Sequence, residues 1–321
     1  MITEEQRNAI NSDLRKLTSD LIIDYSNERA IDNMDNIFHQ PDREAIFECI
    51  RNLMKVLFPG YYRTCSYKVY NVKSMIGPLI EDIHFHLSRQ IAIAMNNTAD
   101  PDHEGDSDSC SCTEKAIEIT TKFLQTIPSV RAKLEEDLAA TYQGDPAAGS
   151  LGEIIVAYPG FFAISIHRLA HELSLLGVPL IPRVMSEYAH SRTGIDIHPG
   201  ATIGHHFFID HGTGIVIGQS TVIGDHVKIY QGVTLGALST QGGQSLKNKR
   251  RHPTIEDNVT IYSNASILGG DTVIGHDSVI GGNAFVTKSV KPGSRVSVKT
   301  EELVISQRRG GNEDENWYYV I

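Results

Sequence analysis

Aliphatic side chains recur at every sixth residue through the last third of the chain, and this period restricts the fold more than any other feature. The series consists of Ile197, Ile203 and Ile209, then Ile217, Ile223, Ile229 and Leu235, then Ile255, Ile261, Ile267, Val273, Val279 and Phe285. A short strand and a tight turn need about six residues, three such units close a triangular coil of about 18, and the next coil stacks on it at about 4.8 Å. The period predicts a parallel β-helix with one aliphatic side chain per face pointing inward, because a β-sandwich would alternate with a period of two.

The chain before residue 194 has a different period. Apolar residues recur there at helical spacing, as in Ile10, Leu14, Leu17 and Leu21, in Ile76, Ile80, Ile83 and Leu87, and in Phe162, Ile166, Leu169, Leu173 and Leu176. We therefore predict an α + β chain of three parts. An all-helical domain for oligomerisation and substrate binding covers 1–194, the β-helix covers 195–290, and a tail covers 291–321.

Composition narrows the classes of function. The chain has 39 acidic against 29 basic residues and a net charge of −10, which argues against binding nucleic acid through a basic surface. No apolar run approaches the roughly 18 residues of a membrane span, and the opening MITEEQRNAI is polar, so we expect a soluble, cytoplasmic protein. Four cysteines are too few for a disulfide framework, and Cys110 and Cys112 lack a second pair at zinc-site spacing, so no metal is expected.

Two irregularities interrupt the six-residue repeat, and both contain histidine. The phase slips by two residues across DHGTG, which contains His211. An inserted loop at 236–254 separates Leu235 from Ile255 and contains His252. A solenoid with otherwise strict register breaks it where something other than packing is required, so both breaks are candidates for a functional site.

The residues around these breaks suggest acyl transfer. Asp196 precedes His211 by slightly less than one coil, so the two side chains can lie on neighbouring coils at the same face. A carboxylate that holds one imidazole nitrogen fixes the tautomer and raises the basicity of the other nitrogen, as a general base for a hydroxyl requires. The basic run at 245–252 is either an arm that attracts an anionic cosubstrate or, through Arg251, a clamp for a carboxylate.

Three segments resemble a known family, the serine O-acetyltransferases of bacteria and plants, which catalyse the first committed step of cysteine biosynthesis. They are GIDIHPGATIG, IDHGTGIVIGQSTVIGDHVKIYQGVTLG and RRHPTIEDNVTIYSNASILGG, and the resemblance is continuous from about Asp145 to Val290. It implies a helical domain joined to a left-handed β-helix. It also implies transfer of the acetyl group of acetyl-CoA to the hydroxyl of L-serine, giving O-acetyl-L-serine and CoA.

The resemblance implies roles for single residues of the first and second segments. Asp196 matches the aspartate that orients the base. His211 matches the base, which takes the proton of the serine hydroxyl while the oxygen attacks the thioester, without an acyl-enzyme. Asp210, together with Asp145 in GDPAAG, matches the carboxylates that hold the substrate amine.

The third segment and the end of the second are matched in the same way. Arg251 and His252 of RRHP match the pair that receives the substrate carboxylate, and we include His252 among the candidate catalytic residues. Backbone amides around Gly236, Ala237 and Ser263 match the groove for the pantetheine arm of acetyl-CoA.

Partners are also implied by the resemblance. We expect a homotrimer or a dimer of trimers, with active sites between subunits. The chain ends in WYYVI after the polar tether GGNEDEN, and in the resembling family a terminal isoleucine, here Ile321, enters the active site of O-acetylserine sulfhydrylase. Docking of this tail on its own β-helix is the alternative.

Three other functions fit the same sequence less well. Another acyltransferase would use homoserine, a sugar or a xenobiotic hydroxyl as acceptor, although Asp145, Asp210 and Arg251 favour an amino acid. A zinc-dependent β-helix carbonic anhydrase would use histidines five residues apart, as His206 and His211 are. A scaffold that only regulates the sulfhydrylase would bind without turnover.

Overall fold

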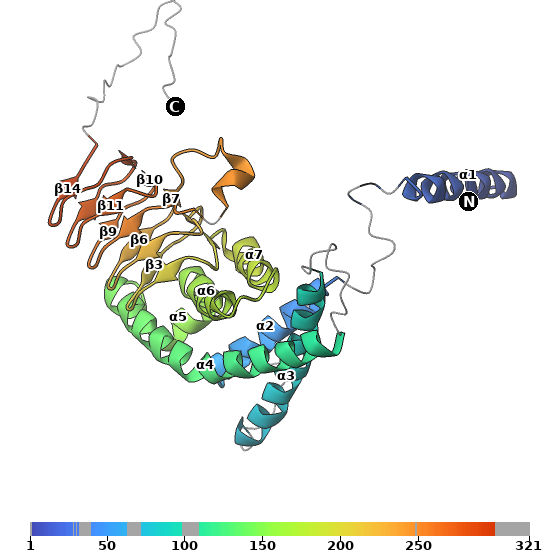
Figure 1. Cartoon of the computed structure of the whole chain (residues 1–321), viewed down its shortest axis with the longest axis horizontal. Helices are drawn as coiled ribbons and strands as arrows, with labels where there is room; N and C mark the ends of the chain where they lie inside the picture. The colour runs from blue at the N-terminus through green and yellow to red at the C-terminus, as the bar shows by residue number, and fades with distance from the viewer. Residues whose placement is uncertain are drawn as a thin grey trace, which may run out of the picture.

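The computed structural model describes residues 2–27, 29, 31, 40–62, 72–97, 109–247 and 249–298, without the side chains of 72–75 and 109–111. Seven α-helices lie in its first 193 residues, and short strands follow from Asp196 (Figure 1). The helices are α1 (Glu4–Tyr25), α2 (Arg43–Leu57), α3 (Val72–Asn96), α4 (Ser109–Gly144), α5 (Leu151–Ala157), α6 (Pro159–Leu175) and α7 (Ile181–Thr193). The predicted helical first part and β-helical second part are both found.

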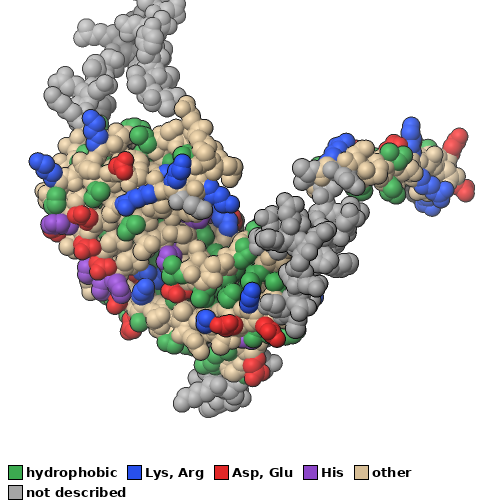
Figure 2. Space-filling model, in the orientation of Figure 1, with side chains coloured by type: hydrophobic (Ala, Val, Ile, Leu, Met, Phe, Trp, Pro, Cys, Tyr) green, Lys and Arg blue, Asp and Glu red, His purple; other side chains and the backbone are tan. Residues whose placement is uncertain are grey.

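Helices α2 to α7 form one packed body, whereas α1 lies apart from it (Figure 1). Helix α6 begins with Pro159 at its first turn, where the missing N–H costs nothing, and most of its side chains are buried. The apolar stripe of α1 is helical as predicted, but no residue of α1 is buried, and its apolar side chains lie at the surface (Figure 2).

A membrane span would need a long apolar helix. No single helix in the described residues is both long and apolar enough to cross a membrane. The pair α5 and α6 reaches the required length and composition only when joined across a bend of 74°, and most of α6 is buried against other elements.

The strands stack into a left-handed parallel solenoid with three flat faces. Sheet A contains β1 (Asp196–Ile197), β4 (Val216–Ile217), β7 (Thr234–Gly236), β10 (Ser266–Leu268) and β13 (Phe285–Val286). Sheet B contains β2 (Thr202–Ile203), β5 (Val222–Ile223), β8 (Thr254–Ile255) and β11 (Val273–Ile274). Sheet C contains β3 (Phe208–Asp210), β6 (Lys228–Tyr230), β9 (Thr260–Ile261), β12 (Val279–Ile280) and β14 (Arg295–Val296). We call the turns between them the A–B, B–C and C–A corners.

The inward column follows the predicted six-residue period as far as Ile267. The prediction is wrong for Val273, Val279 and Phe285, because the buried residues in the last coil are Ile274, Ile280 and Val286, one position later. Phe285 is 71% exposed. The A–B corner before β11 holds one extra residue, at Gly269 and Gly270, and Gly269 has a φ of +107° that a side chain would strain. The Val–Ile pairs of β11 and β12 hide this shift in the sequence, since either residue suits the core.

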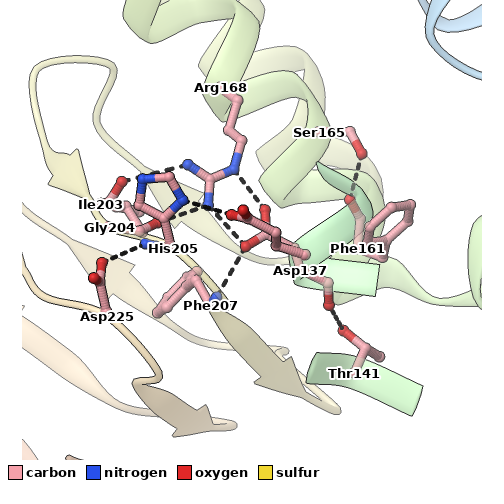
Figure 3. Close-up of polar contacts among 11 residues, drawn as sticks. Asp137, Thr141, Phe161, Ser165, Arg168, Ile203, Gly204, His205, Phe207 and Asp225 are labelled. Carbon is pink, nitrogen blue, oxygen red and sulfur yellow. Dashed lines mark hydrogen bonds and ion pairs between the residues drawn. The ribbon is translucent and has the colours of Figure 1, made fainter. Parts of the chain in front are cut away.

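A buried ion pair joins the helices to the first coil of the solenoid (Figure 3). Arg168 of α6 donates from Nε and Nη2 to the carboxylate of Asp137 in α4, at 2.5 and 2.8 Å. The same guanidinium donates to the carbonyls of Ile203 and Gly204, and Asp137 accepts from the N–H of Phe207 at 2.9 Å. Removal of one partner of such a pair leaves an uncompensated buried charge and costs on the order of 3–5 kcal/mol. These contacts fix the end of α4 against the solenoid.

The stacked strands continue past residue 290, the predicted end of the β-helix. Strand β14 pairs with β12 through Arg295 and Val296. The inserted loop carries a short 3₁₀ turn at Gly243–Leu246 and projects from the solenoid (Figure 1). Residues 299–321, including Ile321, lie outside the described residues.

Candidate active site

Two carboxylates and an imidazole gather at the C–A corner of the first coil. Asp210 ends β3, and His211 follows it at the corner with a φ of +55°. The chain therefore turns at the position where the six-residue repeat slips. The Nδ1 atom of His211 lies 3.7 Å from Oδ1 of Asp210. Asp145 joins them because α4 ends at Gly144, which packs on the ring of Phe208 in β3.

Tyr158 belongs to the same cluster. Its hydroxyl donates to Oδ2 of Asp145 at 2.7 Å, while the N–H of Ala147 donates to Oδ1 at 2.8 Å. These two hydrogen bonds lower the pKa of Asp145, and nearby His211 adds to the effect. The bond to Asp145 is also the main cause that raises the pKa of Tyr158 to about 12. Burial, followed by the charge of Asp210, raises the pKa of Tyr230 on β6.

The A–B corner holds the other predicted pair, Arg251 and His252, at the end of the inserted loop. Oγ of Ser220 accepts from the backbone N–H groups of both residues, at 2.9 and 3.1 Å. The Nη2 atom of Arg251 donates to Oε1 of Gln219 at 2.8 Å. The imidazole of His252 lies directly on Gly218, where a Cβ would stand 2.0 Å from its Cδ2 atom. Only glycine leaves room for this ring.

The hydrogen bonds of His252 define its tautomer. Nδ1 accepts from the backbone N–H of Ser220 at 3.1 Å and lies 2.9 Å from the serine hydroxyl. Burial and the charge of Arg251 lower the pKa of His252 to about 4, so the ring is neutral at pH 7. A neutral ring that accepts at Nδ1 carries its proton on Nε2. His252 is therefore a hydrogen-bond donor, which suits binding of a carboxylate better than proton abstraction.

The predicted partnership between Asp196 and His211 has no direct contact within the described part of the chain. Asp196 begins β1, where its Oδ1 lies 3.9 Å from Nη1 of Arg183 in α7. That oxygen is buried and has no hydrogen-bond donor in the described structure. His211 instead lies within ion-pair distance of Asp210.

The three residues predicted for the pantetheine arm lie at two corners of the solenoid. Gly236 ends β7 on sheet A and Ala237 opens the inserted loop at the A–B corner. Ser263 lies at the C–A corner, between β9 and β10. The predicted substrate residues are divided in the same way. Those around His211 lie at the C–A corner and those around His252 at the A–B corner, at opposite ends of the sheet A strands.

Within one chain, the fold does not bring together the two histidines that suggested a zinc-dependent carbonic anhydrase. His206 lies at the B–C corner, where its ring stacks on His226 at 4.2 Å, whereas His211 lies at the C–A corner. Figure 2 shows histidines beside acidic side chains on this face of the molecule. The Nδ1 atom of His276 lies 2.7 Å from Oδ2 of Asp277. Within the described residues, the group with metal-ligand spacing is Glu187, His190 and Asp196, two of which already form ion pairs with Arg183.

Sequence reasoning missed Gly218, Ser220 and Tyr158. Gly218 and Ser220 stand in turns of the six-residue repeat, and the sequence gives no sign that the inserted loop folds back onto them. Tyr158 precedes Pro159, which marks a helix start, but its contact with Asp145 depends on how α4, α5 and α6 pack.

The chain is similar to known serine acetyltransferases. No family model matches it. A plasmid-borne serine acetyltransferase of Synechococcus elongatus is 44% identical over 266 residues, which cover 82% of this chain and 83% of that protein. The structure of Entamoeba histolytica serine acetyltransferase 1 in complex with L-cysteine is 34% identical, with a TM-score of 0.66 over 81% of this chain and 87% of the other. The Neisseria gonorrhoeae enzyme in complex with serine is 29% identical, with a TM-score of 0.51 over 72% and 90%.

Proposed function

The chain belongs to the serine acetyltransferase family, and we propose that it transfers the acetyl group of acetyl-CoA to the hydroxyl of L-serine with His211 as general base. The observation that carries the assignment of residues is the cluster at the C–A corner. There an imidazole stands beside two carboxylates, Asp145 and Asp210, that form no ion pair with a Lys or Arg in the described structure.

The chemistry of the two corners suits an amino acid. The carboxylates of Asp145 and Asp210 bind the ammonium group of serine, as opposite charges do at short range. At the A–B corner, the guanidinium of Arg251 and the Nε2–H of His252 donate to its carboxylate. An acceptor without an α-amino and an α-carboxyl group would make neither set of contacts.

The reaction follows from this placement. His211 takes the proton of the serine hydroxyl while the oxygen forms a bond to the thioester carbon, and the carbon–sulfur bond breaks to release CoA as a thiolate. The acetyl group passes directly between two bound substrates, so orientation supplies much of the rate. Asp196 remains a proposed orienter of His211, because its Oδ1 lies 3.9 Å from Arg183 but accepts no hydrogen bond in the described structure and can still accept one from an imidazole N–H.

The division of the residues between two corners supports an active site shared by two copies. The C–A corner of one chain would face the A–B corner of its neighbour, and three copies close a ring without a free face. Gly236 and Ala237 would then meet Ser263 of the next copy at the groove proposed for acetyl-CoA. We propose a trimer or a dimer of trimers on this ground.

Mixed oligomers test the shared site. His211→Ala and Arg251→Ala chains are unfolded together in equal amounts, refolded and assayed at a serine concentration well below the KM of Arg251→Ala, where each variant is weak alone. With a shared site in a ring, about a quarter of the interfaces combine an intact His211 with an intact Arg251 of the next copy, so about a quarter of the normal activity returns. No recovery in correctly assembled mixtures would place both residues of one site in the same chain.

The acceptor is tested by a screen with acetyl-CoA. Release of CoA thiol is followed with L-serine, L-homoserine and water, each under saturating acetyl-CoA. Serine should give the highest kcat/KM, because the family to which the chain belongs acetylates serine. A higher kcat/KM for homoserine would make this chain a different acyltransferase, and dependence on added zinc with hydration of CO₂ would support the carbonic anhydrase alternative.

We also propose that the tail binds O-acetylserine sulfhydrylase and that the chain works in the cytoplasm. The tail proposal rests on the sequence WYYVI after an acidic, glycine-containing tether, since residues 299–321 lie outside the described structure. Removal of the last five residues should abolish binding to the sulfhydrylase and leave acetyl transfer unchanged. Equal binding of a decapeptide ending in WYYVI and its C-terminal amide would contradict a role for the carboxylate of Ile321.

A further inference from the structure

We propose that Tyr158 is a positioning residue for the substrate ammonium group, because its hydroxyl fixes the Asp145 carboxylate in the orientation that receives the amine. The inference rests on the proposed function of Asp145 and adds a residue to which the resemblance assigns no role. It also explains why a tyrosine hydroxyl is directed at a carboxylate beside the general base.

The backbone holds both partners of the hydrogen bond rigidly. Tyr158 is at once the C-cap of α5 and the N-cap of α6, and its N–H donates to the carbonyl of Ile154 at 3.1 Å. Two residues later, Gly160 packs against the carbonyl of Ile209, where a Cβ would stand 2.5 Å away. The start of α6 is thereby pressed against β3, immediately before Asp210.

Asp145 is held from its own side. Its N–H donates to Thr141 at 3.0 Å, and its Oδ1 accepts from Ala147 at 2.8 Å. The Tyr158 hydroxyl takes one lone pair of Oδ2 at 2.7 Å. Each carboxylate oxygen accepts more than one hydrogen bond, so both retain capacity for an ammonium group. Without Tyr158, the carboxylate would keep one anchor and could rotate about its Cβ–Cγ bond.

The same hydrogen bond favours the charged state that the substrate needs. A hydroxyl that donates to a carboxylate stabilises the ionised form, and this bond is the largest cause of the lowered pKa of Asp145. The other groups that face Asp145 are the Ala147 N–H, the imidazole of His211 and the side chain of Tyr230, while Tyr158 itself faces Glu153 and Asp210.

The main experiment is Tyr158→Phe, which removes the hydroxyl and keeps the ring. The KM for L-serine should rise about 3- to 30-fold, less than the roughly 10- to 100-fold for losing a charge-assisted hydrogen bond to the substrate itself, because Asp145 keeps its bond from Ala147, while the KM for acetyl-CoA stays unchanged. The matched control is Tyr62→Phe, because the Tyr62 hydroxyl donates at 2.9 Å to a backbone carbonyl, that of Ile155, instead of a carboxylate. The control should leave both KM values unchanged.

Two further measurements separate positioning from a structural role. With 3-hydroxypropionate, which is serine without its amine, kcat/KM should be the same for Tyr158→Phe and the parent chain, because no ammonium group is present to be bound. In Tyr158→Phe, the rise of serine KM at acid pH should begin at a higher pH, since the pKa of Asp145 is no longer lowered by the hydroxyl.

Asp145→Asn distinguishes failure of the inference from failure of the proposed function. If Asp145→Asn raises the serine KM and Tyr158→Phe does not, the positioning role is wrong and the function of Asp145 stands. If Asp145→Asn leaves the serine KM unchanged, both are wrong. The double variant should match Asp145→Asn alone, and additive effects would show that Tyr158 acts elsewhere. Equal losses with serine and 3-hydroxypropionate would likewise overturn the inference.

Discussion

The two corners that hold the predicted substrate residues are built in opposite ways. At the A–B corner, His252 is 7% exposed, lies on Gly218 and is held at its ring and its backbone by Ser220. At the C–A corner, the His211 side chain is 72% exposed, and its Nδ1 atom lies 3.7 Å from Oδ1 of Asp210. The proposed donors for the substrate carboxylate are thus held in place before binding, whereas the proposed base is exposed to solvent.

Because of this difference, we expect the two corners to affect different kinetic parameters. A preformed pair of donors loses little conformational entropy when a carboxylate binds, so under the proposed function the A–B corner should contribute mainly affinity. A base must reach a hydroxyl and carry a proton, so His211 at the C–A corner should contribute mainly turnover, in contrast to Asp145 beside it, which is proposed to bind the ammonium group. Substitutions of His211 and of the A–B corner should therefore divide between kcat and KM.

His211→Ala should produce the largest effect. Turnover should fall by about 10² to 10⁴, the range for losing a general base, while the serine KM changes little. Thermal stability should be preserved because the side chain is exposed. His226→Ala, at the exposed B–C corner, is the control in steady-state assays. More than a tenth of the parent turnover in His211→Ala would remove this residue from the mechanism.

Arg251→Ala should act on affinity. Loss of a guanidinium that pairs with the substrate carboxylate should raise the serine KM by roughly 10- to 100-fold, with a smaller change in kcat. Arg250→Ala is a suitable neighbour for comparison, since Arg250 donates to Thr254 and is assigned no substrate contact. A rise in the KM for acetyl-CoA instead would make the basic run a cofactor arm, the alternative left open by the sequence.

Gly218→Ala tests whether the rigidity of the A–B corner matters. The added methyl group would displace the His252 ring, and a misplaced donor should raise the serine KM on the order of tenfold. Gly77→Ala serves as the control, because a Cβ there meets no atom within 4 Å. An unchanged serine KM in Gly218→Ala would mean that His252 does not need its observed position.

The sequence predicts the solenoid well because each coil repeats one local rule. The inward residue, the strand and the turn all lie within six positions, so the pattern at Ile197 or Ile255 can be recognised without knowing the rest of the fold. The rule fails at Val273, where one extra residue at the preceding corner moves Ile274 into the core. An adjacent Val and Ile carry no signal of that shift.

The sequence identifies candidate residues of the site but does not predict how they are arranged in space. His211 and His252 are marked by breaks in the repeat, but the corner that each occupies follows from counting strands around the coil. The supports Ser220 and Tyr158 meet their partners over 31 and 13 residues of sequence. Contacts of this kind depend on how the inserted loop and the helices pack, which no local pattern specifies.

The smallest expected effect is a difference in how the two corners respond to acid. Burial is the main cause that lowers the pKa of His198 and of His252, both at the A–B corner, to about 4 from an ordinary value of 6.5. Between these values the unfolded chain binds more protons than the folded one, so the free energy of unfolding should fall as the pH drops from about 6.5 to 4. The lowered pKa of Asp145 changes the free energy of unfolding mainly below the ordinary value of 3.8, so Asp145 at the C–A corner should add little to the slope between pH 6.5 and 4.

Urea unfolding at several pH values measures this slope. His198→Gln removes one group that protonates on unfolding and should flatten the slope, whereas His226→Gln replaces an exposed ring at the B–C corner and should leave it unchanged. Buried His167, whose pKa is also held well below 6.5, keeps part of the slope in both variants. Equal slopes for the parent chain and His198→Gln would mean that the A–B corner opens to solvent before the rest unfolds, which would contradict the rigidity from which its role in affinity is argued.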